Sequence, residues 1–242
     1  MSILLWNNRI MNLEIDKLGA YYQCYNNKNA VENVLSNFRR CYPDNEILLI
    51  SDKGEDFSSI AKKYNCTYYY DPLHMGINNL DIIKAKYFLN RVLLCANLIK
   101  SDSLLILEDD VLVKNKLYGN IKENMAGPYF GNEFNPLTID SFNKYKLLNY
   151  SRYYGGSGGT IFNWKSMAPL VISRYNEIIE FIEYSFTLEV DQQKCIDYIW
   201  SLINAFLGFN YQKLDCLDEI LRNPNCINNP KISIIHQYKQ WQ

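Results

Sequence analysis

A short apolar run that ends in three carboxylates is the feature that most constrains the fold of this chain. Residues 104–107 are Leu-Leu-Ile-Leu, and Glu108, Asp109 and Asp110 follow directly. A continuous apolar run of this length is typical of a strand that is buried on both faces of a sheet. Three acids at its end repel one another without a counter-charge, and carboxylate oxygens suit Mg²⁺ or Mn²⁺. The stretch predicts either a metal and phosphate site or a solvated acidic turn.

Strand and helix patterns alternate before this stretch. We expect strands at residues 18–25, 47–50 and 67–70, and helices from Lys28 to the break at 41–44, at 57–64 and at 80–99. Such alternation favours a mostly parallel sheet that is covered by helices on both faces. Ligands of such sheets bind beyond the carboxyl ends of the strands, which is where the three acids fall.

The second half of the chain is less regular. We expect a helix at residues 114–125, a loop at 126–143, helical structure at 164–184, and a helix that ends at Gly208. Four glycines at 155–159 either allow a ligand to approach the backbone closely or form a flexible hairpin turn. A short apolar run at 232–235 leads directly to His236, and nothing resembling a linker divides residues 1–242.

Composition and charge exclude some classes of function. The chain has 242 residues and a net charge of −1, which argues against a nucleic-acid partner that relies on phosphate neutralisation. Seven cysteines without a Cys-x-x-Cys pair indicate reduced thiols instead of disulfides or a zinc site. Because no run has the length of a signal peptide or membrane span, we expect a soluble, cytoplasmic protein without an integral membrane segment.

Several of these stretches together resemble the nucleotide-sugar-dependent glycosyltransferases of the GT-A fold. Residues 20–27 and 42–52 look like the first two strands of that family, and 155–159 is similar to its glycine motif. Glu108-Asp109-Asp110 matches its Asp-x-Asp motif, with Glu in the first place. Residues 189–191 (Glu-Val-Asp) look like a loose form of its acidic motif, and His236 falls where some members place a metal-binding histidine.

The resemblance implies a fold and a cofactor. The expected fold is α/β and GT-A-like (Rossmann-like): a mostly parallel sheet flanked by helices, with a smaller acceptor-side lobe. Residues 1–242 would form one domain, with a nucleotide-binding half at about 18–110 and an acceptor-side half with the tail at about 111–242. The cofactor would be Mn²⁺ or Mg²⁺. Asp110 would ligate it directly, Glu108 would contact the ribose or reach the metal through water, and His236 would complete the coordination; the alternative for His236 is a surface or satisfied core residue.

The resemblance also assigns residues to the nucleotide sugar. These are Gln23, Tyr25, Asp52, Glu108, Asp109, Gly156, Gly158 and Gly159. Asp52 would hydrogen-bond the base, and its alternative is a turn residue before Lys53. Lys84 and Arg91 share one stripe of the helix at 80–99, where they either approach the diphosphate or lie on a solvated face.

An inverting enzyme needs a catalytic base to remove the proton of the acceptor hydroxyl. Asp191 is the candidate and Glu189 the reserve, although Asp191 is also a candidate helix N-cap. In the family the two acids are usually adjacent, whereas here Val190 separates them. This departure bears on the assignment of the base and, with it, on whether the enzyme inverts configuration.

The expected function is metal-dependent transfer of a sugar from a nucleotide sugar, a UDP-sugar by preference, to a hydroxyl of a glycan or protein acceptor. A sugar-nucleotide nucleotidyltransferase is one alternative, but residues 23–27 lack the Gly-rich, Arg- or Lys-bearing loop it would normally show after the first strand. A catalytically inactive nucleotide- or carbohydrate-binding domain is the other.

Overall fold

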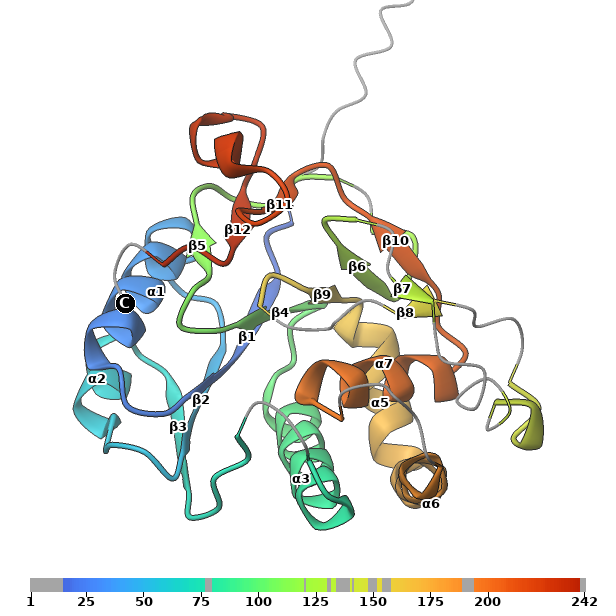
Figure 1. The fold of residues 1–242 in the computed structure, drawn as a ribbon. Coiled ribbons are helices and arrows are strands. Elements are labelled where there is room, and N and C mark those ends of the chain that lie inside the picture. The colour runs from blue at the N-terminus through green and yellow to red at the C-terminus, as the bar shows by residue number, and fades with distance from the viewer. Residues whose placement is uncertain are drawn as a thin grey trace, which may run out of the picture.

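The central element of the fold is a seven-stranded sheet with the order β10-β6-β9-β4-β1-β2-β3 (Figure 1). The structure is a computed structural model. It describes residues 15–76, 80–119, 121–129, 132–133, 140, 142–147, 152–153, 158–188 and 194–239. Strands β1 to β4 pair in parallel, with β1 between β2 and β4. The predicted α/β fold with a mostly parallel sheet is confirmed.

The first half of the chain alternates strictly between strand and helix. Its elements are β1 (Leu18–Cys24), α1 (Lys28–Cys41), β2 (Ile47–Asp52), α2 (Ser58–Lys63), β3 (Thr67–Asp71), α3 (Ile82–Leu98) and β4 (Ser103–Leu107). Local signals place two helix starts: the Asn27 side chain accepts a hydrogen bond from the Ala30 amide, and the Asp81 side chain accepts one from the Lys84 amide. Each predicted strand and helix of this half is present.

The central strands are apolar throughout because both of their faces are covered. Successive side chains of a strand point to opposite faces. In β4, Leu104 and Ile106 therefore join the core that is formed with α3, α5, α6 and α7. Leu105 and Leu107 join the core on the other face, together with α1 and α2. Figure 1 shows these two groups of helices on opposite sides of the sheet.

The second half extends the sheet by antiparallel pairing. Its elements here are β6 (Met125–Gly127), β7 (Asn132–Glu133), β8 (Arg152–Tyr153), β9 (Ile161–Phe162), α5 (Trp164–Ser173), α6 (Tyr175–Thr187), α7 (Ile196–Phe206) and β10 (Tyr211–Lys213). Strand β9 lies antiparallel between β4 and β6, and β7 pairs with β8 in a separate ribbon. Gly208 has a φ of 79° just after α7, which confirms the predicted helix end.

Two local predictions for the second half are wrong, and a third is confirmed with a break. Residues 114–119 and 121–124 contain no helix. Instead, the Lys114 amide donates to the Ser233 carbonyl at 2.8 Å, and tertiary partners outweigh the local helix pattern. The helical structure expected at 164–184 is present, as two helices that meet at Arg174. Helix α7 begins at Ile196 with Cys195 as its N-cap, so the N-cap interpretation of Asp191 does not hold.

A small three-stranded sheet brings the end of the chain to the carboxyl end of β4. Its strands are β5 (Leu112–Val113), β11 (Leu217–Glu219) and β12 (Ile234–His236), with the 3₁₀ helix η1 (Pro224–Asn228) between the last two. Strand β12 runs antiparallel to β5 and parallel to β11. Figure 1 shows this sheet in the upper left part of the molecule, next to α1. Because β5 follows the Glu-Asp-Asp stretch directly, this pairing determines which residues meet there.

Among the described residues, the helices are too short or too polar to cross a lipid bilayer.

Candidate functional site

Two segments that are far apart in the sequence form the candidate site. Glu108, Asp109 and Asp110 follow β4, and His236 ends β12. The register Ile235↔Leu112 brings the end of β12 alongside the acidic stretch. The Tyr238 amide extends this contact by donating a hydrogen bond to the Asp110 carbonyl at 2.8 Å.

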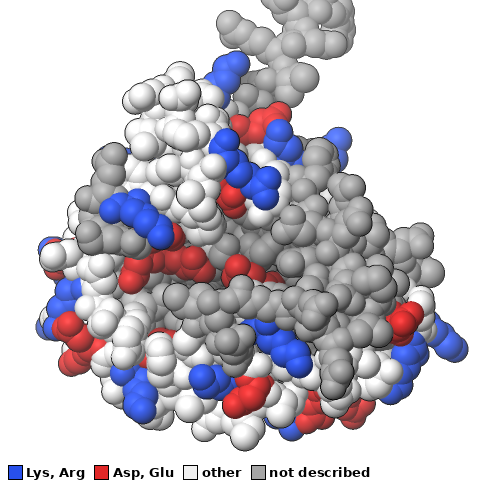
Figure 2. All heavy atoms as spheres, in the orientation of Figure 1, with Lys and Arg blue, Asp and Glu red and all other residues white. Residues whose placement is uncertain are grey.

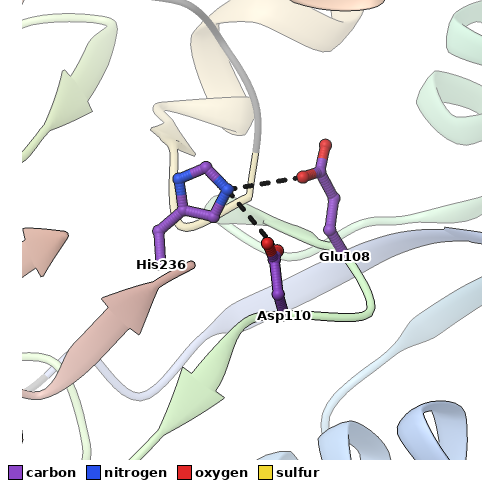
Figure 3. A group of neighbouring side chains, drawn as sticks. All are labelled: Glu108, Asp110 and His236. Atoms are coloured by element: carbon purple, nitrogen blue, oxygen red, sulfur yellow. Dashed lines mark ion pairs between the residues drawn. The ribbon is translucent and has the colours of Figure 1, made fainter. Parts of the chain in front are cut away.

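Glu108, Asp110 and His236 point toward one another (Figure 3). Nε2 of His236 lies 3.5 Å from Glu108 Oε2 and 3.5 Å from Asp110 Oδ1. One candidate ligand atom from each residue lies within 4.8 Å of the other two. Asp110 Oδ1 is buried and has no hydrogen-bond partner. A buried carboxylate oxygen without a donor is costly unless a cation is bound, so the residues fit a divalent metal ion.

The electrostatics of this cluster are those of crowded, buried acids. Burial raises the pKa of Asp110, although the neighbouring His236 opposes this. Burial lowers the pKa of His236, but Glu108, Glu219 and Asp110 more than reverse this and raise it to about 10. In the metal-free protein at neutral pH, the imidazolium is therefore a counter-charge within the cluster, a role that a bound cation would take over.

Asp109 points to a different partner from its two neighbours. The hydroxyl of Tyr22, which is fully buried in β1, donates a hydrogen bond to Asp109 Oδ1 at 2.7 Å. Burial raises the pKa of Asp109 to about 6, although this hydrogen bond opposes the shift, and Asp110 and Glu108 add to it by repulsion. The side chain of the middle residue of the motif is thus held in place by a hydrogen bond from the neighbouring strand β1.

Gly158 packs directly on the cluster. A Cβ atom at this position would lie 2.5 Å from Val111 Cγ2, 3.0 Å from His236 Cδ2 and 3.2 Å from Glu108 Cβ. Gly159 follows with a φ of 84°, and its amide donates to the Ile106 carbonyl at 2.9 Å. The two glycines therefore let this turn approach the metal-site residues more closely than any larger residue could.

Glu219 is a neighbour of the cluster that the sequence analysis missed. It is buried, and its Oε1 lies 3.7 Å from Nδ1 of His236. Glu219 is the direct partner of His236 in the β11–β12 pair. The two residues are separated in sequence and belong to short strands without a strong pattern, so the contact had no sequence signal beyond the acid itself.

The nucleotide-binding residues predicted in the first half lie at the carboxyl ends of β1 and β2. Tyr25 follows β1 and is 42% exposed. Its ring stacks on His74, with 4.3 Å between the ring centroids. Gln23 accepts a hydrogen bond from the Tyr21 hydroxyl at 3.0 Å. His74 is a further residue that the sequence analysis did not select.

Asp52 is buried within a separate charge cluster. Its Oδ1 accepts hydrogen bonds from Arg91 Nη2 at 2.7 Å and from the Met75 amide at 2.9 Å, and its Oδ2 lies 2.9 Å from His74 Nδ1. A base contact by Asp52 would have to replace one of these partners, and that role stays a prediction. Arg91 is buried and donates from Nε to Asp71, so the solvated helix face proposed for it is wrong.

A pocket of about 530 Å³ opens beside the candidate metal ligands, a volume within the usual range for small-molecule sites. It is lined by Asp110, Ile220, Leu221, Ile227, His236, Gln237 and Lys239. Lys239 also lowers the pKa of Asp110 through its charge. On the face shown in Figure 2, acidic side chains gather in a hollow across the middle of the molecule, with basic side chains around it. Anionic ligands can reach such a hollow only if a cation offsets its charge.

Three predicted site residues, Gly156, Glu189 and Asp191, lie outside the described residues. Their assignments therefore stay predictions.

Comparisons with solved structures place this fold among the glycosyltransferases. The chain is similar to the bifunctional glycosyltransferase WbbM in its apo form, with a TM-score of 0.52, 10% identity, and coverage of 93% of this chain and 46% of WbbM. It is similar to the galactosyltransferase LgtC in complex with donor and acceptor sugar analogues, with a TM-score of 0.50 and 14% identity. That match covers 92% of this chain and 87% of LgtC. An active-site mutant of LgtC matches with the same TM-score and identity.

The chain resembles these proteins in structure far more than in sequence. Neither the models of protein families nor the curated protein sequences give a match. At this level of identity the solved structures establish the fold, and it is the GT-A fold that the sequence motifs predicted. The chain spans less than half the length of WbbM but most of LgtC.

Proposed function

We propose that this protein is a metal-dependent glycosyltransferase that transfers a sugar from a nucleotide sugar, by preference a UDP-sugar, to a hydroxyl of a glycan or protein acceptor. The donor would bind on the half at about 18–110 and the acceptor on the half at about 111–242. The proposal combines the GT-A fold with the chemistry of one cluster of side chains.

The observation that carries the proposal is the unpartnered, buried Asp110 Oδ1 beside Glu108 and His236. Two carboxylates and an imidazole are a suitable donor set for Mn²⁺ or Mg²⁺. The cluster lies beyond the carboxyl end of β4, where parallel α/β sheets bind ligands. A binding domain that had lost its chemistry would have no need to keep this costly arrangement.

Asp110 and His236 would hold the metal directly, and Glu108 would contact the ribose or reach the metal through water. When bound, the cation stabilises the negative charge that builds on the diphosphate as the glycosidic bond breaks. His236 must be neutral to act as a ligand, so it gives up its proton when the metal binds.

Other residues of the chain would position the donor around this centre. Tyr25 presents a half-exposed ring at the end of β1, which suits stacking on a nucleobase. Gln23 and Asp52 are proposed to contact the same part of the donor. Asp109 is held by Tyr22, and the close packing of Gly158 and Gly159 supports a turn that lies against the sugar-phosphate. Gly156 is also proposed to contact the nucleotide sugar.

The catalytic base is proposed to be Asp191, with Glu189 as the reserve. An acid near the acceptor hydroxyl would remove its proton as the new bond forms. Asp191→Asn should keep donor binding and remove transfer to the acceptor. Full transfer by this variant would exclude Asp191 as the base.

Thermal unfolding with a panel of nucleotides tests the proposal most directly. The melting temperature of the purified protein would be measured with UDP, GDP, CDP and their sugars, each with and without Mn²⁺. A ligand that binds the native state raises the melting temperature by mass action. We expect a rise with UDP and its sugars that requires Mn²⁺.

The matched variants are Asp110→Ala and Asp102→Ala. Asp102 lies before the other end of β4, so its loss removes the same charge away from the site. Asp110→Ala should lose the metal-dependent rise and Asp102→Ala should keep it; an unchanged rise in Asp110→Ala contradicts the metal assignment. A rise with nucleoside triphosphates instead favours the nucleotidyltransferase, and donor binding without transfer in a broad acceptor screen favours the binding domain.

A further inference from the structure

Glu219 and His236 form a buried pair across the β11–β12 ladder. The register places the two residues directly opposite each other in parallel strands. Side chains at such positions share one face of the sheet and lie within contact distance. Both residues are buried, with 6% of Glu219 and 8% of His236 exposed. A buried carboxylate next to an imidazole is held there by the strand pairing itself.

The two ring nitrogens of His236 face different carboxylates. Nε2 faces Glu108 and Asp110 at 3.5 Å, whereas Nδ1 lies 3.7 Å from Glu219 Oε1. Figure 3 shows Nδ1 on the side of the ring that points away from Glu108 and Asp110. Nδ1 is buried without a hydrogen-bond partner, and Glu219 Oε1 is the acceptor that the structure places beside it. Glu219 is therefore on the wrong side of the ring to ligate the same cation.

Arg222 restrains the second oxygen of Glu219. Its Nε donates to Glu219 Oε2 at 3.2 Å, and its guanidinium carbon lies 3.6 Å from the centroid of the Tyr129 ring. The cation–π contact and the hydrogen bond fix the guanidinium between two partners. Glu219 Oε1 is thereby left on the side of His236.

We propose that Glu219 is a positioning residue that accepts a hydrogen bond from Nδ1–H of His236 and so presents Nε2 as the metal-binding nitrogen. This inference rests on the proposed metal site. A histidine ligand almost always donates its other ring N–H to a carboxylate, carbonyl or water, which fixes the tautomer and the ring orientation. A small rotation of the ring would close the 3.7 Å separation between Nδ1 and Glu219 Oε1 to a hydrogen bond.

The first test is Mn²⁺ binding without any nucleotide, measured by electron paramagnetic resonance of the free ion. Three variants would be compared with the wild-type protein: Glu219→Gln, Glu219→Leu and Asp215→Asn. Gln keeps an acceptor and removes the charge, whereas Leu removes both. Asp215 precedes the same strand, and its carboxylate is 94% exposed, so it controls for the loss of one negative charge.

We expect the Mn²⁺ affinity to fall about tenfold in Glu219→Gln and up to about a hundredfold in Glu219→Leu, the range found for such outer partners of metal ligands. Asp215→Asn should bind as the wild type does. Because Gln has nearly the same shape as Glu, the Glu219→Gln variant still tests the role of Glu219 if the Glu219→Leu variant fails to fold. Equal affinity in wild type and Glu219→Gln and Glu219→Leu overturns the inference.

The second readout is the tautomer of His236 by ¹⁵N nuclear magnetic resonance with Mg²⁺ bound. The chain contains only two histidines, so a His74→Gln variant assigns both signals. We expect the proton on Nδ1 in the wild type and a mixture of tautomers in Glu219→Leu. A purely structural role for Glu219 would lower the melting temperature and leave the tautomer unchanged, which would also overturn the inference.

The failure of this inference differs from the failure of the proposed function. If the wild-type protein binds no Mn²⁺, the metal site itself is wrong. If the wild type binds Mn²⁺ through Asp110 and substitution of Glu219 does not change the affinity, the metal site is supported and only the positioning role of Glu219 is wrong.

Discussion

Two clusters of buried or partly buried acids lie at the carboxyl ends of the parallel strands, and they are neutralised in different ways. The first consists of Asp52 at the end of β2 and Asp71 at the end of β3, with Arg91 from α3 between them. The second consists of Glu108 and Asp110 after β4, with His236. Both have acids in the same part of the sheet, so position alone does not distinguish a structural cluster from a ligand site.

The carboxylates of the first cluster are fully paired within the chain. Arg91 donates to both carboxylates at 2.7 Å, and the amides of Leu73 and Met75 donate to the remaining oxygens. One guanidinium nitrogen, Nη1, has no hydrogen-bond partner, but each carboxylate oxygen has one. A permanent cation with several donors makes this cluster a structural link between two strands and a helix.

The second cluster is incomplete. Its histidine lies 3.5 Å from each of the two acids, which is a loose contact, and Asp110 Oδ1 has no hydrogen-bond partner. An imidazolium can lose its proton, whereas a guanidinium cannot. The first cluster therefore has a permanent counter-charge from Arg91, whereas the counter-charge of the second, where we propose that a metal ion binds, can be exchanged.

The largest expected effect comes from removing the built-in counter-charge. Arg91→Met should destabilise the protein by about 3–5 kcal/mol, because two buried carboxylates lose their cation. Urea unfolding measures this free energy. Lys84→Met, on the same helix, is the control and should change it by no more than about 0.5 kcal/mol. Equal losses in the two variants would contradict the structural role of Arg91.

Removing an acid from the incomplete cluster should act mainly through the metal. We expect Asp110→Asn to leave the metal-free stability within about 1 kcal/mol of wild type, since one of two repelling charges is neutralised. It should also lose the stabilisation by Mn²⁺, which is about 2.7 kcal/mol at a hundred times the Kd. Unfolding with and without Mn²⁺ gives both values, and Asp102→Asn should behave as wild type. Retained Mn²⁺ stabilisation in Asp110→Asn would show that the cation binds elsewhere.

Crowding the second cluster sterically should have an intermediate effect. Gly158→Ala adds a Cβ that meets Val111 at 2.5 Å and His236 at 3.0 Å, so we expect a stability loss of about 1–3 kcal/mol and weaker Mn²⁺ binding. Gly76→Ala is the control: its φ of 72° adds backbone strain, but the nearest atom to the new Cβ is 4.0 Å away, so it crowds no neighbour. It should lose some stability and keep its Mn²⁺ affinity. Wild-type Mn²⁺ affinity in Gly158→Ala would contradict the packing argument.

The smallest expected effect is the change in metal affinity for each unit of pH. The pKa of His236 is raised to about 10 in the metal-free protein, so the metal must displace a proton at any pH below that value. Binding should tighten by up to about tenfold, or about 1.4 kcal/mol, for each unit that the pH rises between about 6 and 8. Competition titrations at several pH values measure this slope. His74→Gln should keep it and His236→Gln should flatten it; a flat profile in the wild type would exclude His236 as a ligand.

The same pKa has the opposite effect on the metal-free fold. A group whose folded-state pKa is raised stabilises the protein fully below its unfolded pKa, which is about 6.5 for histidine. That contribution is lost as the pH rises toward about 10. Raising the pH thus weakens the cluster without metal and strengthens it with metal.

Local patterns were sufficient for the first half of the fold. Its inner strands are largely apolar because both faces of the sheet are covered there, and helices α1 and α3 each show an apolar face after a capping residue. The same logic failed at residues 114–125, where the backbone pairs with residues near the end of the chain. There the Leu117 amide donates to the hydroxyl of Tyr42, a partner that no local pattern can supply.

The candidate site was predictable only in part. The Glu-Asp-Asp stretch was predicted as a site because it follows a buried strand, and the resemblance to the family's motifs pointed to His236. Glu219 and the burial of Arg91 were not predictable, because each depends on a partner from another element. An acid or an arginine has the same sequence signal on a surface as in a buried pair.

By itself, the sequence determined the order of strands and helices in the first half of the chain, since apolar periodicity and caps act over a few residues. It also determined that acids follow the central strand β4. Only the tertiary structure decided which acids pair with Arg91 and which lie beside His236. The pairing of β12 with β5 and β11 made that choice, because charges interact through space and the chain brings Glu108, Glu219 and His236 together only when folded.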